Sequence, residues 1–152
     1  MKILETRQYS FLKNKILKKK KLYACLDNAI KNFFIDHNTF EKVYESNYFI
    51  QAKAGLKIIK IRLPNKTMNQ GKSGGYRLIL ACNSKTESIV LLTVYPKLGN
   101  LGKSDLETSE LTKLLKGLKM DIAENSLKNY STPKIQQSDK TKKKLAKKKQ
   151  GD

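Results

Sequence analysis

The sequence predicts an α+β domain in which one antiparallel β-sheet packs against two N-terminal helices, with a further helix after the sheet. Apolar residues recur at three- and four-residue spacing over residues 11–36, which is typical of helices. From residue 56 the pattern changes to short β-branched runs separated by polar, glycine-bearing connections. We expect one domain over residues 1–130, with its helices on one face of the sheet, and a basic tail over 131–152.

The first third of the chain is predicted to hold a short strand over 2–8 and two helices. Ser10 is a suitable N-cap for a helix over 11–21, which carries lysines on its outer side. The second helix is predicted over 21–36, and segment 37–53 is expected to be a loop with a short strand or turn. The apolar stripe of the second helix consists of Leu22, Cys25, Leu26, Ala29, Ile30 and Phe33.

Three β runs follow, at 56–63, 76–83 and 88–97. Their connections are too short for a crossover helix, so the runs are predicted to form an antiparallel meander. Ile59 and Ile61 alternate with Lys60 and Arg62 in the first run, so the two cations should share the face opposite these isoleucines.

The C-terminal part is predicted to form a helix and then a tail. Ser104 and Glu107 have the spacing of a capping box and are expected to open a helix over 105–125. The tail, 131–152, holds eight lysines against two aspartates and no core-forming pattern, so we expect disorder there until a partner binds.

The charge is strongly positive, since 32 Lys and Arg face 13 Asp and Glu, a formal +19. An AT-rich genome together with a solvated surface would explain the preference for lysine over arginine, but it would not explain the scarcity of acids. The balance indicates a polyanionic partner: nucleic acid first, an acidic protein second and an anionic membrane surface third.

The cysteines and the N-terminus indicate a protein of a reducing compartment. Cys25 and Cys82 are isolated within apolar runs, so we expect small buried core residues and no structural zinc site. The first ten residues lack the apolar stretch of a signal peptide, and no run approaches the roughly 18 apolar residues of a membrane span. We therefore expect a soluble cytoplasmic protein with no membrane partner.

Several cations and one tyrosine fall near the ends of neighbouring predicted strands. A charged residue at a strand end is usually only solvated, but strand ends of a meander lie close together and can build one concave basic patch. Gly71, Lys72 and Ser73 resemble the end of a nucleotide-binding P-loop, yet Lys66 occupies the required first glycine position and a strand follows. The expected patch consists of Lys60, Arg62, Lys72, Arg77, Tyr95 and Lys97.

The run GKSGGYRLIL at 71–80, continued by SIVLLTVYPK at 88–97, resembles the centre of the RelE/ParE toxin superfamily, especially its HigB-like branch. AGLKIIKIRLP at 54–64 and DLETSELTKLLKGL at 105–118 are similar to the flanking strand and helix, so the resemblance covers about residues 50–118. It implies a RelE-like fold and a bacterial type II toxin that cleaves mRNA in the ribosomal A site without metal or cofactor. The implied partners are the 70S ribosome, mRNA and a cognate HigA-like antitoxin, either acidic or DNA-binding through a helix-turn-helix.

The implied reaction is attack by a ribose 2′-OH on its own 3′ phosphate, which needs a base, charge stabilisation and an acid. His37 is the chain's single histidine, so a two-histidine mechanism is excluded within one chain. The resemblance implies instead that Lys60 or Lys72 activates the 2′-OH and that Arg77, with Arg62, holds the phosphate.

The remaining implied roles concern RNA contacts. Tyr95 would stack on or orient a base, or take part in proton transfer, and Lys97 would contact the phosphate backbone. Lys57 and Lys66 are expected to bind RNA outside the reacting group.

Two alternatives stay open. ParE-like members of the same superfamily inhibit DNA gyrase, although they generally lack such a basic cluster. A small ribosome-associated or RNA-binding protein without catalysis is the other alternative, because charge alone is enough for binding.

Overall fold

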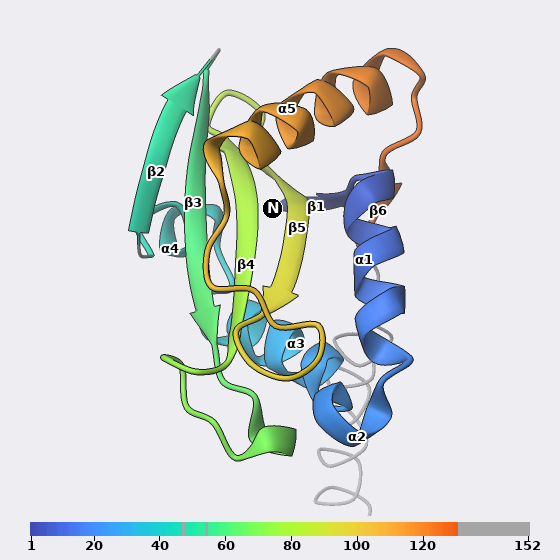
Figure 1. Cartoon of the computed structure of the whole chain (residues 1–152). Helices are drawn as coiled ribbons and strands as arrows, with labels where there is room; N and C mark the ends of the chain where they lie inside the picture. Colours follow the sequence, from blue (N-terminus) through green and yellow to red (C-terminus); the bar gives the residue numbers. More distant parts are fainter. Residues whose placement is uncertain (47, 54, 131–152) are drawn as a thin grey trace, which may run out of the picture.

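The computed structural model describes residues 1–46, 48–53 and 55–130, and Figure 1 shows a twisted sheet with helices on both of its faces. The predicted tail, 131–152, lies outside the described residues. In chain order the elements are β1 (Lys2–Glu5), α1 (Arg7–Leu17), α2 (Lys20–Tyr23), α3 (Leu26–Asp36), α4 (Phe40–Tyr44), β2 (Tyr48–Lys53), β3 (Leu56–Leu63), the 3₁₀ helix η1 (Lys66–Met68), β4 (Tyr76–Asn83), β5 (Ser88–Pro96), α5 (Thr108–Ala123) and β6 (Lys128–Asn129).

The sheet has the strand order β2-β3-β4-β5-β1-β6. Strands β2 to β5 pair antiparallel, so the predicted meander is confirmed at nearly its predicted bounds. β1 differs from the expectation of a wholly antiparallel sheet because it pairs parallel to β5, with Lys2 opposite Ser88. The chain between these two strands passes through the N-terminal helices and the whole meander, which is long enough to permit a parallel pairing.

Helices cover both faces of the sheet, which corrects the prediction that they lie on one face. Ile59, Ile61 and Leu78 pack against α1 to α4 on one side. Ile58 and Ile79, on the other side, pack against α5. Because the central strands β3, β4 and β5 are apolar on both sides, the second side also needs a cover, and α5 supplies it. The buried side chains of α5 that do so are Leu111, Leu114 and Leu118.

The N-terminal helices differ from the prediction at their ends. α1 begins at Arg7 because the Thr6 hydroxyl accepts the Tyr9 backbone N–H at 3.1 Å, so Ser10 lies inside the helix and is not its cap. The single helix expected over 21–36 is divided into α2 and α3 at residues 24–25.

Two further boundaries also shift. Glu107 and Glu110 form the reciprocal capping box of α5, three residues later than the predicted Ser104–Glu107 pair. In segment 37–53 the expected short strand is β2, whereas α4, capped by Thr39, was not predicted. Among the described segments, no helix combines the length and apolar character needed to cross a membrane.

The two cysteines have different environments and form no disulfide. Cys82 is buried as expected, and burial raises the pKa of its thiol to about 12. Cys25, in contrast to the prediction, is only half-buried, and its thiol donates to Asn65 Oδ1 at 3.2 Å. Burial raises the pKa of the Cys25 thiol, but hydrogen bonds with Thr67 and Tyr76 outweigh this effect, so its pKa is lowered overall.

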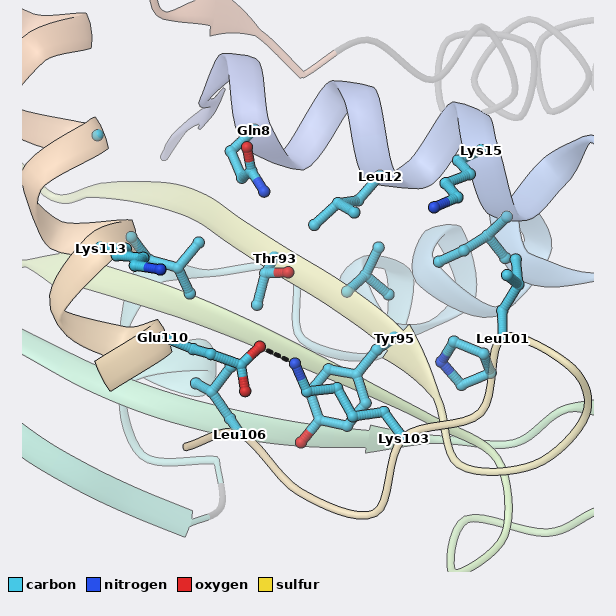
Figure 2. Close-up of a pocket in the computed structure, with 15 residues that line it drawn as sticks. Gln8, Leu12, Lys15, Thr93, Tyr95, Leu101, Lys103, Leu106, Glu110 and Lys113 are labelled. Atoms are coloured by element: carbon cyan, nitrogen blue, oxygen red, sulfur yellow. Dashed lines mark hydrogen bonds and ion pairs between the residues drawn. The ribbon is translucent and has the colours of Figure 1, made fainter. Parts of the chain in front are cut away.

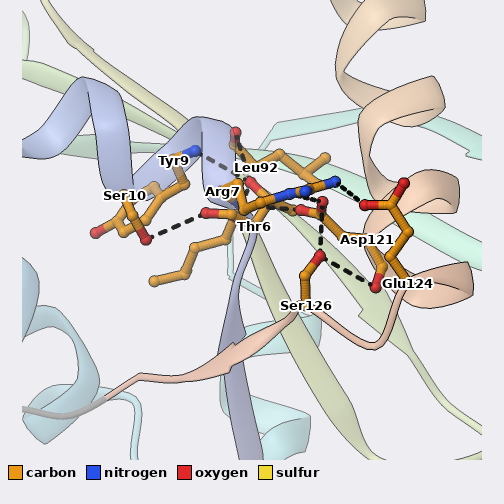
Figure 3. A network of polar contacts seen from close by, with 9 residues as sticks. Thr6, Arg7, Tyr9, Ser10, Leu92, Asp121, Glu124 and Ser126 are labelled. Atoms are coloured by element: carbon orange, nitrogen blue, oxygen red, sulfur yellow. Dashed lines mark hydrogen bonds and ion pairs between the residues drawn. The ribbon is translucent and has the colours of Figure 1, made fainter.

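A polar network joins the start of α1 to the end of α5 (Figure 3). The buried Asp121 carboxylate accepts the Arg7 backbone N–H at 2.9 Å and Arg7 Nε at 2.6 Å. Ser126 Oγ donates to Asp121 Oδ1 at 3.1 Å, and Arg7 also pairs with Glu124. Burial raises the pKa of Asp121, but the hydrogen bonds from Arg7 and Ser126 outweigh burial and hold it below its ordinary value. This network therefore fixes α5 over its face of the sheet.

Asp121→Asn is expected to lower the free energy of unfolding by about 1–3 kcal/mol, because it leaves buried donors with a weaker acceptor. The pKa of Asp121 is lowered on folding, so the stabilisation is present above the ordinary carboxyl value of about 3.9 and is lost as the pH falls through the lower folded value. Urea unfolding between pH 7 and pH 3 should therefore show the difference between the wild type and the variant shrinking in acid.

Glu124→Gln is the matched control, because Glu124 is exposed and pairs with the same arginine. Its unfolding free energy should stay within about 0.5 kcal/mol of the wild type. Equal losses in the two variants would contradict a special role of the buried carboxylate.

Candidate functional site

The strand register places three of the predicted site residues in one row across the sheet. Arg62 on β3 lies opposite Arg77 on β4, and Arg77 lies opposite Tyr95 on β5. Arg62 and Arg77 share the side of Ile58 and Ile79, which is the side that α5 covers. Tyr95 belongs to the same core cluster as these isoleucines. The row therefore lies on one face of the sheet.

Lys60 and Lys97 join this row through a loop that folds over it. Lys60 Nζ lies 3.5 Å from Asp105 Oδ1, and Lys97 Nζ donates to the Ser104 carbonyl. We call the set Lys60, Arg62, Arg77, Tyr95 and Lys97 the sheet patch. The structure thus brings five of the six expected patch residues together.

Asp105 is a carboxylate at the edge of the sheet patch that the sequence analysis did not identify. The Leu106 backbone N–H lowers the pKa of Asp105, and Lys60 and Lys97 lower it further. The side chain stays 72% exposed, so it can move away from Lys60. The patch thus already holds one anionic oxygen beside Lys60. The sequence does contain this acid in the segment 98–106. The predicted capping box placed Asp105 inside a helix, so the sequence analysis did not consider it as part of the patch.

Arg77 is buried, with 4% of its surface exposed. Its Nη1 donates to the carbonyls of Lys72 at 2.9 Å and Tyr76 at 3.1 Å, and its Nη2 donates to the Ser73 carbonyl at 2.8 Å. The guanidinium therefore holds the 72–76 backbone in place. These contacts fit a positioning role better than the direct phosphate contact expected from the sequence.

Gly75 allows the loop to approach β3 closely. A Cβ at this position would lie 1.9 Å from the Leu63 carbonyl oxygen and 2.8 Å from the Asn65 nitrogen. The Gly75 carbonyl also accepts the Lys97 backbone N–H at 2.8 Å. Gly75 is thus explained by the close contact between the loop and the ends of β3 and β5.

Tyr95 forms part of the wall of a pocket between α1 and α5, shown in Figure 2. Its ring lies below Lys103, whose Nζ is 5.7 Å from the ring centroid and pairs with Glu110. The Tyr95 hydroxyl is buried and makes no hydrogen bond within the described part of the chain. Burial, followed by the nearby Asp105 charge, raises the pKa of Tyr95 to about 12. At neutral pH this phenol is a proton donor and not a base.

The other three predicted residues lie outside the sheet patch. Lys66 and Lys72 line a second pocket, between α3 and the connection from β3 to β4, and Arg62 lines it as well. Lys57 belongs to the opposite face of β3, where its Nζ donates to the Tyr44 carbonyl at 2.7 Å and lies 4.1 Å from the Tyr44 ring centroid. Lys57 thus packs on α4 and cannot act together with Lys60.

Arg77→Lys is expected to destabilise the 72–76 loop, because an ammonium group cannot donate in the same fork geometry to these three carbonyls. We expect a loss of about 1–3 kcal/mol in unfolding free energy, since buried carbonyls lose their donors. Hydrogen exchange should become faster for the amides of this loop. Arg62→Lys, in the neighbouring register position, is the control, and an unchanged loop in Arg77→Lys would contradict the positioning role.

Comparison with models of known protein families gave no match, and no curated protein proved significantly similar to this chain. The site is therefore interpreted from its own geometry and charge.

Proposed function

We propose that this protein is a type II toxin of the RelE/HigB kind, a ribosome-dependent endoribonuclease that cleaves mRNA and so inhibits translation. The observation that carries the proposal is the row of Arg62, Arg77 and Tyr95 across three neighbouring strands, with Lys60 and Lys97 beside it. Such a set offers cations for a phosphodiester and a phenolic proton for a leaving oxygen.

The element order supports a RelE-like arrangement. An N-terminal strand and helices precede the meander, and a helix follows it, as the resemblance of residues 50–118 implies. The formal charge of +19 favours the 70S ribosome and mRNA as partners, because both are polyanions. It also favours an antitoxin with an acidic surface, of the HigA-like kind, in the bacterial cytoplasm.

The proposed chemistry begins when a ribose 2′-hydroxyl, made more acidic by the neighbouring Lys60 cation, gives its proton to solvent water and its oxygen attacks the adjacent phosphorus. The bond to the 5′-oxygen breaks, which leaves a 2′,3′-cyclic phosphate and a 5′-hydroxyl. Lys60 and Arg62 would stabilise the charge that develops on the phosphate oxygens. Tyr95, protonated at neutral pH, would donate to the leaving oxygen, and Arg77 would hold the loop. Because Asp105 pairs with Lys60, a bound phosphate would replace its carboxylate.

A non-catalytic RNA-binding protein is the second candidate. The observations that favour it are the use of the Arg77 guanidinium in holding the loop and the buried position of the Tyr95 hydroxyl. Primer extension on translated transcripts separates the two functions, because only a nuclease creates new 5′ ends. A gyrase supercoiling assay tests the ParE-like alternative.

Lys60→Ala and Arg62→Ala are each expected to lower the rate of ribosome-dependent mRNA cleavage by about a hundredfold or more, since each removes a cation from the developing charge. Cleavage is measured by mapping 5′ ends in a purified translation system. The same variants should relieve growth inhibition when the protein is expressed alone.

Lys85→Ala is the matched control, because Lys85 is exposed in the turn between β4 and β5, at the opposite end of these strands from Arg77. It should cleave like the wild type. Wild-type protein that inhibits growth without creating new 5′ ends, with or without translation, would reject the nuclease proposal.

Tyr95→Phe is expected to fold with equal or greater stability, because it removes a buried hydroxyl that makes no hydrogen bond within the described residues. Its cleavage rate should nevertheless fall by about tenfold to a hundredfold if the phenol donates the proton. Thermal unfolding and single-turnover cleavage measure the two effects separately. A variant as active as the wild type would remove Tyr95 from the reaction.

A further inference from the structure

The second pocket, between α3 and the connection from β3 to β4, is strongly basic. We call it the α3 pocket, and Figure 1 shows α3 and the end of β3 that contribute to it at the lower end of the sheet. Its cations come from four separate places in the chain: Lys31, Arg62, Lys66 and Lys72. One carboxylate, Asp36, also lines it. The excess of cations favours an anionic ligand.

The side of the pocket that α3 forms carries aromatic rings and amide groups. The ring of His37 stacks on that of Phe33, with centroids 4.2 Å apart and planes at 19°. His37 Nδ1 also donates to the Phe33 carbonyl at 3.0 Å. The stacking contact and this hydrogen bond together fix the orientation of the imidazole ring. Phe33 is buried and His37 is half-buried, which leaves part of the imidazole for a ligand. Asn28 and Asn32, one helical turn apart, bring amides to the same pocket.

Two arginines of the sheet patch, Arg62 and Arg77, also contribute to the α3 pocket, the first directly and the second through the loop that carries Lys72. Arg62 lines the α3 pocket and also a separate pocket that holds Lys60 and Asp105. Arg77 holds the carbonyls of Lys72 and Ser73, so it fixes the loop that carries Lys72 to the α3 pocket. Arg62 therefore borders both the α3 pocket and the pocket of Lys60.

We propose that the α3 pocket binds one nucleotide of single-stranded RNA beside the phosphate held at Arg62. This inference rests on the proposed function, because it places the nucleotide next to the phosphate that is cleaved. The base stacks on His37, the amides of Asn28 and Asn32 face its edges, and Lys31, Lys66 and Lys72 neutralise the adjoining phosphate. Stacking, edge recognition and charge together are the requirements for binding single-stranded RNA.

The test uses the full chain and a short, fluorescent 2′-O-methyl RNA, which cannot undergo 2′-OH attack. Lys31→Ala/Lys66→Ala is compared with Lys85→Ala/Lys116→Ala, which removes the same charge from exposed positions elsewhere. By anisotropy at low salt, the pocket pair should bind about tenfold more weakly and the control pair about twofold more weakly at most. Equal losses in the two pairs would overturn the proposal, because they would show attraction by net charge alone.

The base contact is tested with the same RNA and an abasic version. His37→Ala should weaken binding of the intact RNA by about tenfold, which is the size expected for one stacked base. It should leave the affinity for the abasic RNA unchanged. Asn32→Ala, an exposed position, repeats the comparison in case the loss of His37 loosens α3. The proposal would be overturned if the variants lost the same affinity for the intact RNA as for the abasic RNA. So would an acidic peptide that shows the same difference between the two lysine pairs, because it would indicate a protein ligand.

None of these measurements needs cleavage or a ribosome. A wild-type protein that binds RNA with this pattern but creates no 5′ ends would overturn the proposed nuclease and leave a nucleotide site. A protein that cuts translated mRNA but shows no difference between the lysine pairs would overturn the α3 pocket alone.

Discussion

The antiparallel register of β3, β4 and β5 is the constraint on which the rest of the structure depends. It aligns Arg62, Arg77 and Tyr95 in one row, and a shift of one residue in any strand would move that strand's side chain to the other face. The same register is held by apolar side chains on both faces, from residues such as Ile59 and Ile79. Burial of the core and alignment of the cations are thus two results of one pairing.

The basic residues divide into those whose charged groups are used within the fold and those whose charged groups stay available for a ligand. Arg77 is buried, and donating to three carbonyls offsets the large cost of removing its charge from water. Lys57 likewise has a structural role, because its ammonium group donates to the Tyr44 carbonyl and lies over the Tyr44 ring. Lys60 pairs with the exposed carboxylate of Asp105, so a phosphate can compete for it. Position in the fold, and not residue type, separates these roles.

Much of the sheet could be predicted, because alternation has a period of two and the connections are short. Lys60 and Arg62 are separated from Ile59 and Ile61 by this alternation alone. Helix ends were predicted less well because several nearby residues can act as caps. Thr6 and Ser10 are both suitable, and Thr6 is the cap because its hydroxyl can also donate to the Leu91 carbonyl of β5.

The sequence by itself determined the strand pattern, the positive charge and the face of the sheet that carries the cations, since all of these follow from local order and composition. Only the tertiary structure decided that β1 runs parallel to β5 and that α5 covers the second face. It also decided that Asp105 meets Lys60 and that α3 forms a pocket with Arg62 and Lys72. These contacts join residues far apart in the chain, and their positions depend on how the helices pack, which no local pattern encodes.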